Sequence, residues 1–427
     1  MFATASNNSL VKTTSYKVVL PFYIYAAFSF LAATVLLFTS SGSLKYFSPQ
    51  TLAITHTMTL GWGTMIILGA SHQLVPVLIE GKLFSNILAY FSFVLAAIGI
   101  PLLVYAFYTF NMKLPAQTGA ALVSSAVVLF LINLLASVIK SKKENVQAIF
   151  IFTATIWLFI TTTVGLLLVC NFTDDLLPKD SLHYLSLHAH IGIAGWFLLL
   201  IIGVGSRLIP MFLISKYTNT KLLWWIYSLI NFGLISFVFI FLNFPQTLLY
   251  LLPIASVLSG LLLFVYYCYN SYRQRIRKQV DEQMKISLLS VLMMIVPILF
   301  LLIVIILLLL SIENTQLILL YGFTIFFGWI TAIILGMTFK TLPFIVWNKV
   351  YHAKAGMGKT PSPKDLFSSK LFNSMAFIYI AGFLCFVIGM IIPDDLLIKV
   401  GALFLLFCAL LYNANVFKII LHKRKPG

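Results

Sequence analysis

Charged residues are scarce in this chain. Only 9% of its 427 residues are charged, whereas a soluble domain carries roughly 25%. Hydrophobic residues make up 61%, and the mean hydropathy is +1.03. With so few charges the chain cannot cover a soluble fold with polar side chains. The composition therefore predicts an all-α integral membrane protein whose main partner is the lipid bilayer.

Cysteine is rare as well. Cys170, Cys268, Cys385 and Cys408 all lie within apolar stretches, with no CxxC spacing, so disulfides and thiolate metal sites are not expected. The net charge of +17 is carried by cations in short loops between apolar runs. That pattern is typical of membrane topology and excludes nucleic acid as a partner.

Membrane-spanning helices need about 20 mainly apolar residues each, and the sequence contains about twelve such stretches within one membrane domain, residues 1–427. We expect transmembrane helices near residues 18–40, 50–77, 85–109, 116–139, 148–170, 183–213, 222–243, 247–270, 286–310, 316–345, 371–392 and 396–421.

The distribution of charge orients these spans. All lysines and arginines except Lys45, Lys113, Lys179 and Lys399 fall at the termini or near the loops that follow even-numbered spans. The other loops carry acids such as Asp180. By the positive-inside rule both termini are cytoplasmic, in the plasma or inner membrane of the cell.

A motif recurs at nearly even spacing in the second, sixth and tenth spans. Each copy contains a Gly-Trp pair, then a second glycine and a proline. The three copies comprise Gly61, Trp62, Gly69 and Pro76; Gly195, Trp196, Gly203 and Pro210; and Gly328, Trp329, Gly336 and Pro343. Small residues alone indicate close helix packing. Three copies predict three pseudo-threefold four-helix repeats, residues 16–140, 148–272 and 285–421.

Three of the seven histidines, His56, His188 and His190, lie inside predicted spans near the extracytoplasmic end. His56 and His190 hold the same repeat position, five residues before Gly-Trp. His72 is expected to reach the cytoplasmic interface, and His183 lies at the outer mouth of the sixth span.

A histidine inside the membrane must find a partner, because lipid offers none. One interpretation is structural: each imidazole bonds Thr55, Thr57, Ser186 or a carbonyl. The other is that the imidazoles are axial ligands of haem iron. His188 and His190 point about 200° apart on a helix, so they serve separate compartments and do not share one small ion.

In the haem interpretation, His56 and His190 hold one haem between them, and His188 faces the next compartment. Small and aromatic residues beside these histidines would form a slot for the flat porphyrin. The expected cofactor-packing residues are Gly61, Trp62, Gly192, Gly195 and Trp196.

With His56 in the second span and the His-x-His stretch Leu187-His188-Ala189-His190, the chain resembles subunit I of the haem–copper oxidases, including the stand-alone and nitric-oxide-response members. The resemblance implies twelve helices in three arcs with haems near the outer third of the membrane. His56 matches the helix 2 haem ligand. His188 and His190 match the His-x-His pair, which the family places on helix 10. Phe323 stands at the equivalent position of the tenth span here.

Other features depart from that family. Ala194 stands where the copper site needs a tyrosine, and residues 222–243 contain no histidine, so copper is not expected. Proton pumping is not expected either, because no carboxylate lies clearly inside a span. The expectation is haem b, one group or two, in electron transfer or O₂ or NO chemistry, with respiratory or cytochrome subunits as partners. Whether the protein is an oxidoreductase enzyme stays open.

Two other functions remain open from the sequence. Repeats with glycine or proline interruptions, such as Pro76, also occur in secondary transporters. Alternatively, the protein is a non-catalytic assembly partner of a respiratory complex. In that case the histidines only pack, and Arg207 and Lys340 are interface anchors.

Overall fold

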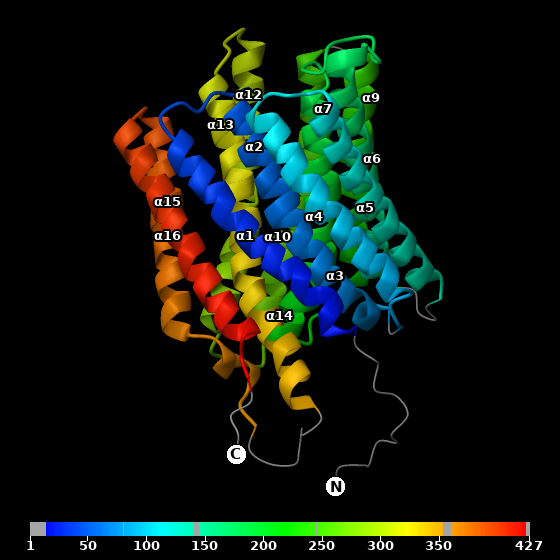
Figure 1. The fold of residues 1–427 in the computed structure, drawn as a ribbon, viewed down its shortest axis with the longest axis vertical. Coiled ribbons are helices and arrows are strands. Elements are labelled where there is room, and N and C mark those ends of the chain that lie inside the picture. The colour runs from blue at the N-terminus through cyan, green and yellow to red at the C-terminus, as the bar shows by residue number, and fades with distance from the viewer. Residues whose placement is uncertain (1–13, 80, 141–144, 245, 353–359, 424–427) are drawn as a thin grey trace.

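The computed structural model describes residues 14–79, 81–140, 145–244, 246–352 and 360–423. In this part of the chain 83% of the residues are helical and no strand occurs. Twelve helical segments are long and apolar enough to cross a membrane, and we number them as spans 1 to 12. The predicted count of about twelve spans is confirmed. The spans run side by side as one bundle (Figure 1), and α1 begins at the same end of the bundle at which α16 finishes.

Several spans are divided into consecutive helical segments. Spans 1 to 4 are α1 (Tyr16–Ser40); α2 (Pro49–His56), η1 (Thr57–Thr64) and α3 (Met65–Leu78); α4 (Asn86–Tyr108); and α5 (Leu114–Ile139). Spans 5 to 8 are α6 (Val146–Asp174); α7 (Leu185–His190), η2 (Ile191–Leu198) and α8 (Leu199–Leu213); α9 (Thr220–Asn243); and η3 (Thr247–Tyr250) with α10 (Leu251–Arg273). Spans 9 to 12 are α11 (Glu282–Met293) with α12 (Ile295–Leu309); α13 (Thr315–Phe323), η4 (Thr324–Ile330) and α14 (Thr331–Tyr351); α15 (Ser369–Ile391); and α16 (Asp395–Ile420).

Most helix starts are fixed by a polar residue just before the first turn. Its side-chain oxygen accepts a backbone N–H that would otherwise lack a partner. The capping residues are Ser15, Ser48, Ser85, Asn145, Asn219, Asp281, Asn314, Ser368 and Asp394. These caps explain why the short loops between apolar runs are rich in serine, asparagine and aspartate.

The three Gly-Trp sequences share one local structure. In spans 2, 6 and 10 the α-helix changes to a π-helix for one or two turns, and the π segment begins directly after His56, His190 and Phe323. In span 10 the backbone is kinked at Gly328, and the Tyr379 hydroxyl donates to the carbonyl oxygens of Phe327 and Gly328. π segments of this kind are frequent at functional sites.

Two of the motif tryptophans connect spans that lie far apart in the sequence. Nε1 of Trp62 donates to the Thr331 hydroxyl at 3.2 Å, and Nε1 of Trp196 donates to the Thr64 hydroxyl at 3.0 Å. Both tryptophans are buried. These bonds join spans 2 and 10 and spans 2 and 6 at the middle of the bundle.

Helix packing follows one scheme along the chain. Helices α1, α6 and α11 each pack against the span that carries the next π segment, and α4/α5, α9/α10 and α15/α16 form antiparallel pairs. Glycine permits the closest approaches. A Cβ at Gly69 would lie 2.6 Å from Cβ of Phe22, and one at Gly203 would lie 2.5 Å from Cβ of Phe150.

We expect Thr64→Val to destabilise the bundle. The substitution keeps the side-chain volume but leaves the buried Nε1 of Trp196 without its acceptor, which costs about 1–3 kcal/mol of unfolding free energy. Unfolding in detergent measures the change. The control is Thr39→Val at an exposed threonine, expected to stay within about 0.5 kcal/mol of the parent. Equal unfolding midpoints for Thr64→Val and the parent would show that the bond contributes nothing.

Candidate functional site

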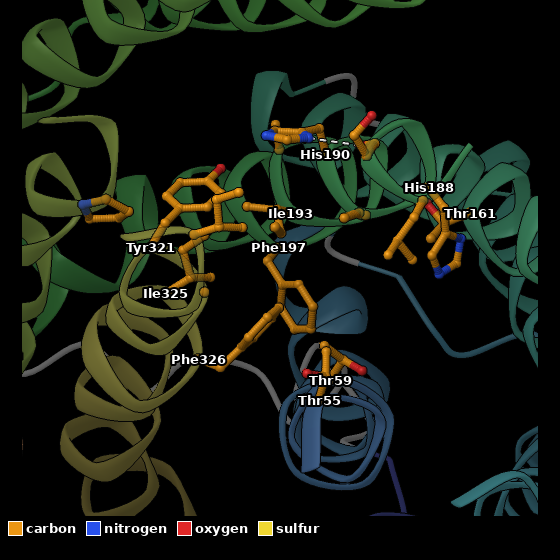
Figure 2. Close-up of a pocket in the computed structure, with 18 of the residues that line it drawn as sticks. Thr55, Thr59, Thr161, His188, His190, Ile193, Phe197, Tyr321, Ile325 and Phe326 are labelled. Atoms are coloured by element: carbon orange, nitrogen blue, oxygen red, sulfur yellow. Dashed lines mark hydrogen bonds between the residues drawn. The ribbon is translucent and has the colours of Figure 1, made fainter. Parts of the chain in front are cut away.

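One cavity joins the histidines of spans 2 and 6. Its volume is about 630 Å³, and most of the side chains that line it are apolar. His56, His188 and His190 all border it. Figure 2 shows polar groups gathered in a few places along this wall, among them Thr55, Thr59 and the Tyr321 hydroxyl. The volume lies within the range of about 300–1,000 Å³ that is usual for small-molecule and cofactor sites.

His56 and His188 form a pair across this cavity. Their ring centroids are 6.4 Å apart, and the ring planes differ by only 16°. Phe107 packs against the His56 ring at 4.4 Å between centroids. This centroid separation is wider than that of two rings stacked directly face to face.

His56 and His190 are held in the same way. Nδ1 of His56 lies 2.8 Å from the Leu52 carbonyl oxygen, and Nδ1 of His190 lies 2.7 Å from that of Ser186. Because a carbonyl only accepts, Nδ1 carries the proton, and Nε2 keeps its lone pair in the neutral ring. A bond of this kind orients a metal-ligating histidine. The acceptor of each Nδ1 proton is a backbone carbonyl of the same helix. The Thr55 and Thr57 hydroxyls are not the partners of His56.

His188 is seated on a glycine of span 5. A Cβ at Gly165 would lie 2.9 Å from Cε1 of the His188 ring, so any larger residue would push the ring away. Nδ1 of His188 is buried and makes no hydrogen bond of ordinary length. The ring is therefore positioned by packing against Gly165 and by a contact with the Thr161 carbonyl that is longer or less well aligned than an ordinary hydrogen bond.

His190 points away from His188, as two residues on a helix require, and faces span 10 (Figure 2). The centroid of its ring lies 5.8 Å from that of Tyr321, with 22° between the ring planes, and 5.2 Å from that of Phe237. The sequence predicted that His56 pairs with His190. The structure instead places His188 beside His56, because the side of span 6 that faces span 2 carries residue 188.

At the third equivalent position the cavity wall is aromatic. The ring of Phe323 stacks on Phe386 at 4.0 Å between centroids, and on Phe327 and Phe383 at 5.1 and 5.8 Å. In span 10, stacked phenyl rings therefore occupy the position that an imidazole occupies in spans 2 and 6.

Of the five residues predicted to pack against a cofactor, two line the cavity and three do not. Gly192 and Trp196 line the cavity. Gly61 and Gly195 instead allow close helix packing, because a Cβ would lie 2.7 Å from the Ser29 hydroxyl oxygen and 2.6 Å from Cβ of Trp157 respectively. Trp62 stacks on Phe30 at 4.6 Å in the core.

His72 does not reach the interface as predicted. It is 1% exposed, lies between the rings of Phe22 and Phe130, and neither ring nitrogen makes a hydrogen bond of ordinary length. The apolar faces of α1 and α5 cover it. His183, just before α7, is exposed.

Among the described residues no group of three or more His, Cys, Asp or Glu side chains is placed to hold a metal ion. The site therefore offers pairs of ligands and no protein-only cage. Of the two cations considered as anchors, Lys340 forms an ion pair with Asp281, and Arg207 is exposed.

Comparison of the chain with models of protein families and with curated proteins finds no match. The geometry of the site therefore carries the functional argument.

Sequence reasoning missed three residues of the site: Phe107, Gly165 and Tyr321. A signal existed for Tyr321, because it stands two residues before Phe323 just as His188 stands two before His190. Gly165 and Phe107 had no such signal, since they contact the histidines from spans 5 and 3, outside the repeated motif.

We expect His72→Leu to stabilise the protein. Leucine removes a buried polar ring that makes no hydrogen bond of ordinary length and has only a long or poorly aligned contact with the Leu68 carbonyl. A buried polar group left unsatisfied costs about 1–3 kcal/mol. The melting temperature in detergent is the measurement, with His183→Leu at the exposed histidine as the control that leaves it unchanged. A lower melting temperature for His72→Leu would mean that the imidazole has a partner or a packing role of its own.

Proposed function

We propose that the protein binds haem b, with the imidazoles of His56 and His188 as the two axial ligands, and that it transfers electrons within the membrane. The ring geometry is the observation that carries this. Two imidazoles on opposite sides of one metal atom, with metal–nitrogen bonds of about 2.0–2.1 Å, have ring centres roughly 6 Å apart. The observed separation is 6.4 Å with nearly parallel planes.

The surroundings of the pair fit such a group. The cavity is apolar and of adequate volume, and the Nδ1 bond of His56 leaves Nε2 as the donor atom. The bound haem would supply reversible one-electron exchange, and the chain would set its potential through ligand identity, burial and the hydrogen bond to His56.

We also infer that the chain consists of three four-helix units related by pseudo-threefold symmetry. The three π segments, the two Trp-to-Thr bonds and the recurring packing scheme support it. The ring pairs follow the same rule. His56 of the first unit faces His188 of the second, and His190 of the second faces Tyr321 of the third. In both pairs the first residue stands five positions before a Gly-Trp pair and the second stands seven positions before the next one.

Within this proposal the protein is a divergent relative of haem–copper oxidase subunit I, with cytoplasmic termini in the cell membrane as the loop cations predict. His190 is the candidate ligand for a second haem in the adjoining compartment. The proposal includes no copper, because span 7, which carries copper ligands in that family, contains no histidine.

The visible spectrum of the purified protein tests the proposal. We expect oxidised and dithionite-reduced spectra of a low-spin haem b, and at least a roughly tenfold loss of that haem in His56→Ala and in His188→Ala, since each removes a ligand. His190→Ala should keep it, because His190 faces Tyr321. His183→Ala is the exposed control.

Other results are equally informative. Loss of the low-spin haem in His190→Ala but not in His188→Ala would restore the pairing predicted from sequence. Colourless protein from cells with ample haem would refute the proposal and favour a transporter or an assembly partner.

Gly165 gives a second test, on the seat of His188. We expect Gly165→Ala to weaken haem binding about 10–100-fold, as loss of ligand-orienting contacts does, and to shift the midpoint potential. The matched control is Gly322→Ala, which adds a methyl group to the wall of the same cavity where a Cβ meets nothing within 4 Å. Equal haem affinity in both variants would show that Gly165 does not position the ring.

A further inference from the structure

Two loops at one end of the bundle are joined through their backbones. They follow α8 and α10, on the side where α1 begins (lower end in Figure 1). The N–H of Ile276 donates to the Ile214 carbonyl at 3.0 Å, and Ser215 and Arg275 form an antiparallel bridge. We refer to residues 214–221 and 273–278 as the paired-loop surface. The backbone contacts hold the two loops side by side.

The paired-loop surface is rich in cations without carboxylate partners. The carboxylate of Asp281 forms ion pairs with Lys340 and Arg277, and that of Glu282 forms one with Lys285. In the described part of the chain no ion pair involves the surface's remaining cations, Lys216, Lys221, Arg273, Arg275 and Lys278. Positive charge is therefore concentrated here and is not balanced locally.

Apolar side chains lie among these cations. Ile214 is 52% exposed and Ile276 is 61% exposed, at the point where the loops pair. Trp225, in the first turns of α9, is 66% exposed. The left-handed backbone of Ile214, with φ 52°, is unusual for a β-branched residue and ends α8 with this side chain turned outward. Tryptophan at a helix end is typical of the membrane–water boundary.

Arg275 stiffens the surface. Its guanidinium lies 3.8 Å from the centre of the Tyr272 ring and donates to the Tyr272 carbonyl at 2.7 Å. This contact holds one charge in place over an aromatic ring. The neighbouring Lys216, Arg273 and Lys278 remain exposed, so they are free to meet a ligand.

We propose that the paired-loop surface binds the phosphate headgroup of an anionic lipid, with its acyl chains against Ile214 and Ile276. Clustered cations beside a membrane helix attract anionic headgroups with about 1 kcal/mol per Lys or Arg. A soluble acidic partner would use the cations but not the isoleucines at the membrane boundary. The lipid uses both. This inference does not depend on haem binding.

The test compares lipid binding of two triple variants in neutral detergent. Phosphatidylglycerol is added to the protein, and stabilisation is followed as the rise in melting temperature, with phosphatidylcholine as the neutral lipid. Lys216→Gln/Arg273→Gln/Lys278→Gln should bind phosphatidylglycerol on the order of 100-fold more weakly, and each single variant about fivefold more weakly. The control Lys45→Gln/Lys113→Gln/Lys399→Gln removes three exposed cations from the opposite loops and should bind like the parent.

The melting temperature without lipid shows that each variant is folded. If the paired-loop triple variant and the parent respond equally to phosphatidylglycerol, the proposal is wrong. It is also wrong if glycerol phosphate alone stabilises the parent as well as the lipid does, because the ligand would then be a soluble anion. A response to phosphatidylglycerol that fades in 1 M salt, where the Debye length is about 3 Å, supports it.

Discussion

The need to satisfy polar groups away from water shapes this bundle. An imidazole in hydrocarbon has no solvent partner, and His56 and His190 meet that need with the carbonyl four residues earlier in their own helices. The bond fixes the tautomer, so Nε2 is left as an acceptor, and both histidines border the cavity. A π-helix follows each of these histidines. The buried tryptophans obey the same constraint by donating to Thr331 and Thr64, and those bonds hold the three central spans together.

One backbone arrangement carries three different side-chain sets. Between spans 2 and 6 two imidazoles stand 6.4 Å apart, between spans 6 and 10 an imidazole and a phenol stand 5.8 Å apart, and at Phe323 stacked phenyl rings fill the place. The first distance suits one metal atom between two nitrogens. The second does not suit a linear nitrogen–metal–oxygen arrangement, since a phenol oxygen lies farther from its ring centre than an imidazole nitrogen does. In our proposal each compartment's role therefore follows from side chains and not from the fold.

Much of this could be predicted from the sequence, because hydropathy and the period of a helix are local properties. The spans, the depth of His56 and the opposed directions of His188 and His190 follow from them. The partner of His56 does not, since a helical period gives the angle between two side chains but not which of them faces a given neighbour. Gly165 was invisible for the same reason: its role comes from the ring of span 6 that rests on it. His72 was misjudged because depth along a helix does not tell whether α1 and α5 cover it.

A comparison of His72 with His188 shows which observation supports the proposed ligand role. His72 is buried and His188 is half-buried, and each has a buried ring nitrogen that makes no hydrogen bond of ordinary length. This feature alone therefore does not separate them. His72 is enclosed by Phe22 and Phe130 and, in the described part of the chain, does not border the cavity. His188 borders it, rests on Gly165, where even a methyl group would crowd the ring, and lies beside His56. The Nδ1 bond of His56 leaves its Nε2 without a proton. Local rules are commonly broken at functional sites. At His188 the break coincides with a cavity, a ring held by packing and a second imidazole nearby, and these three features support the ligand role that we propose for it.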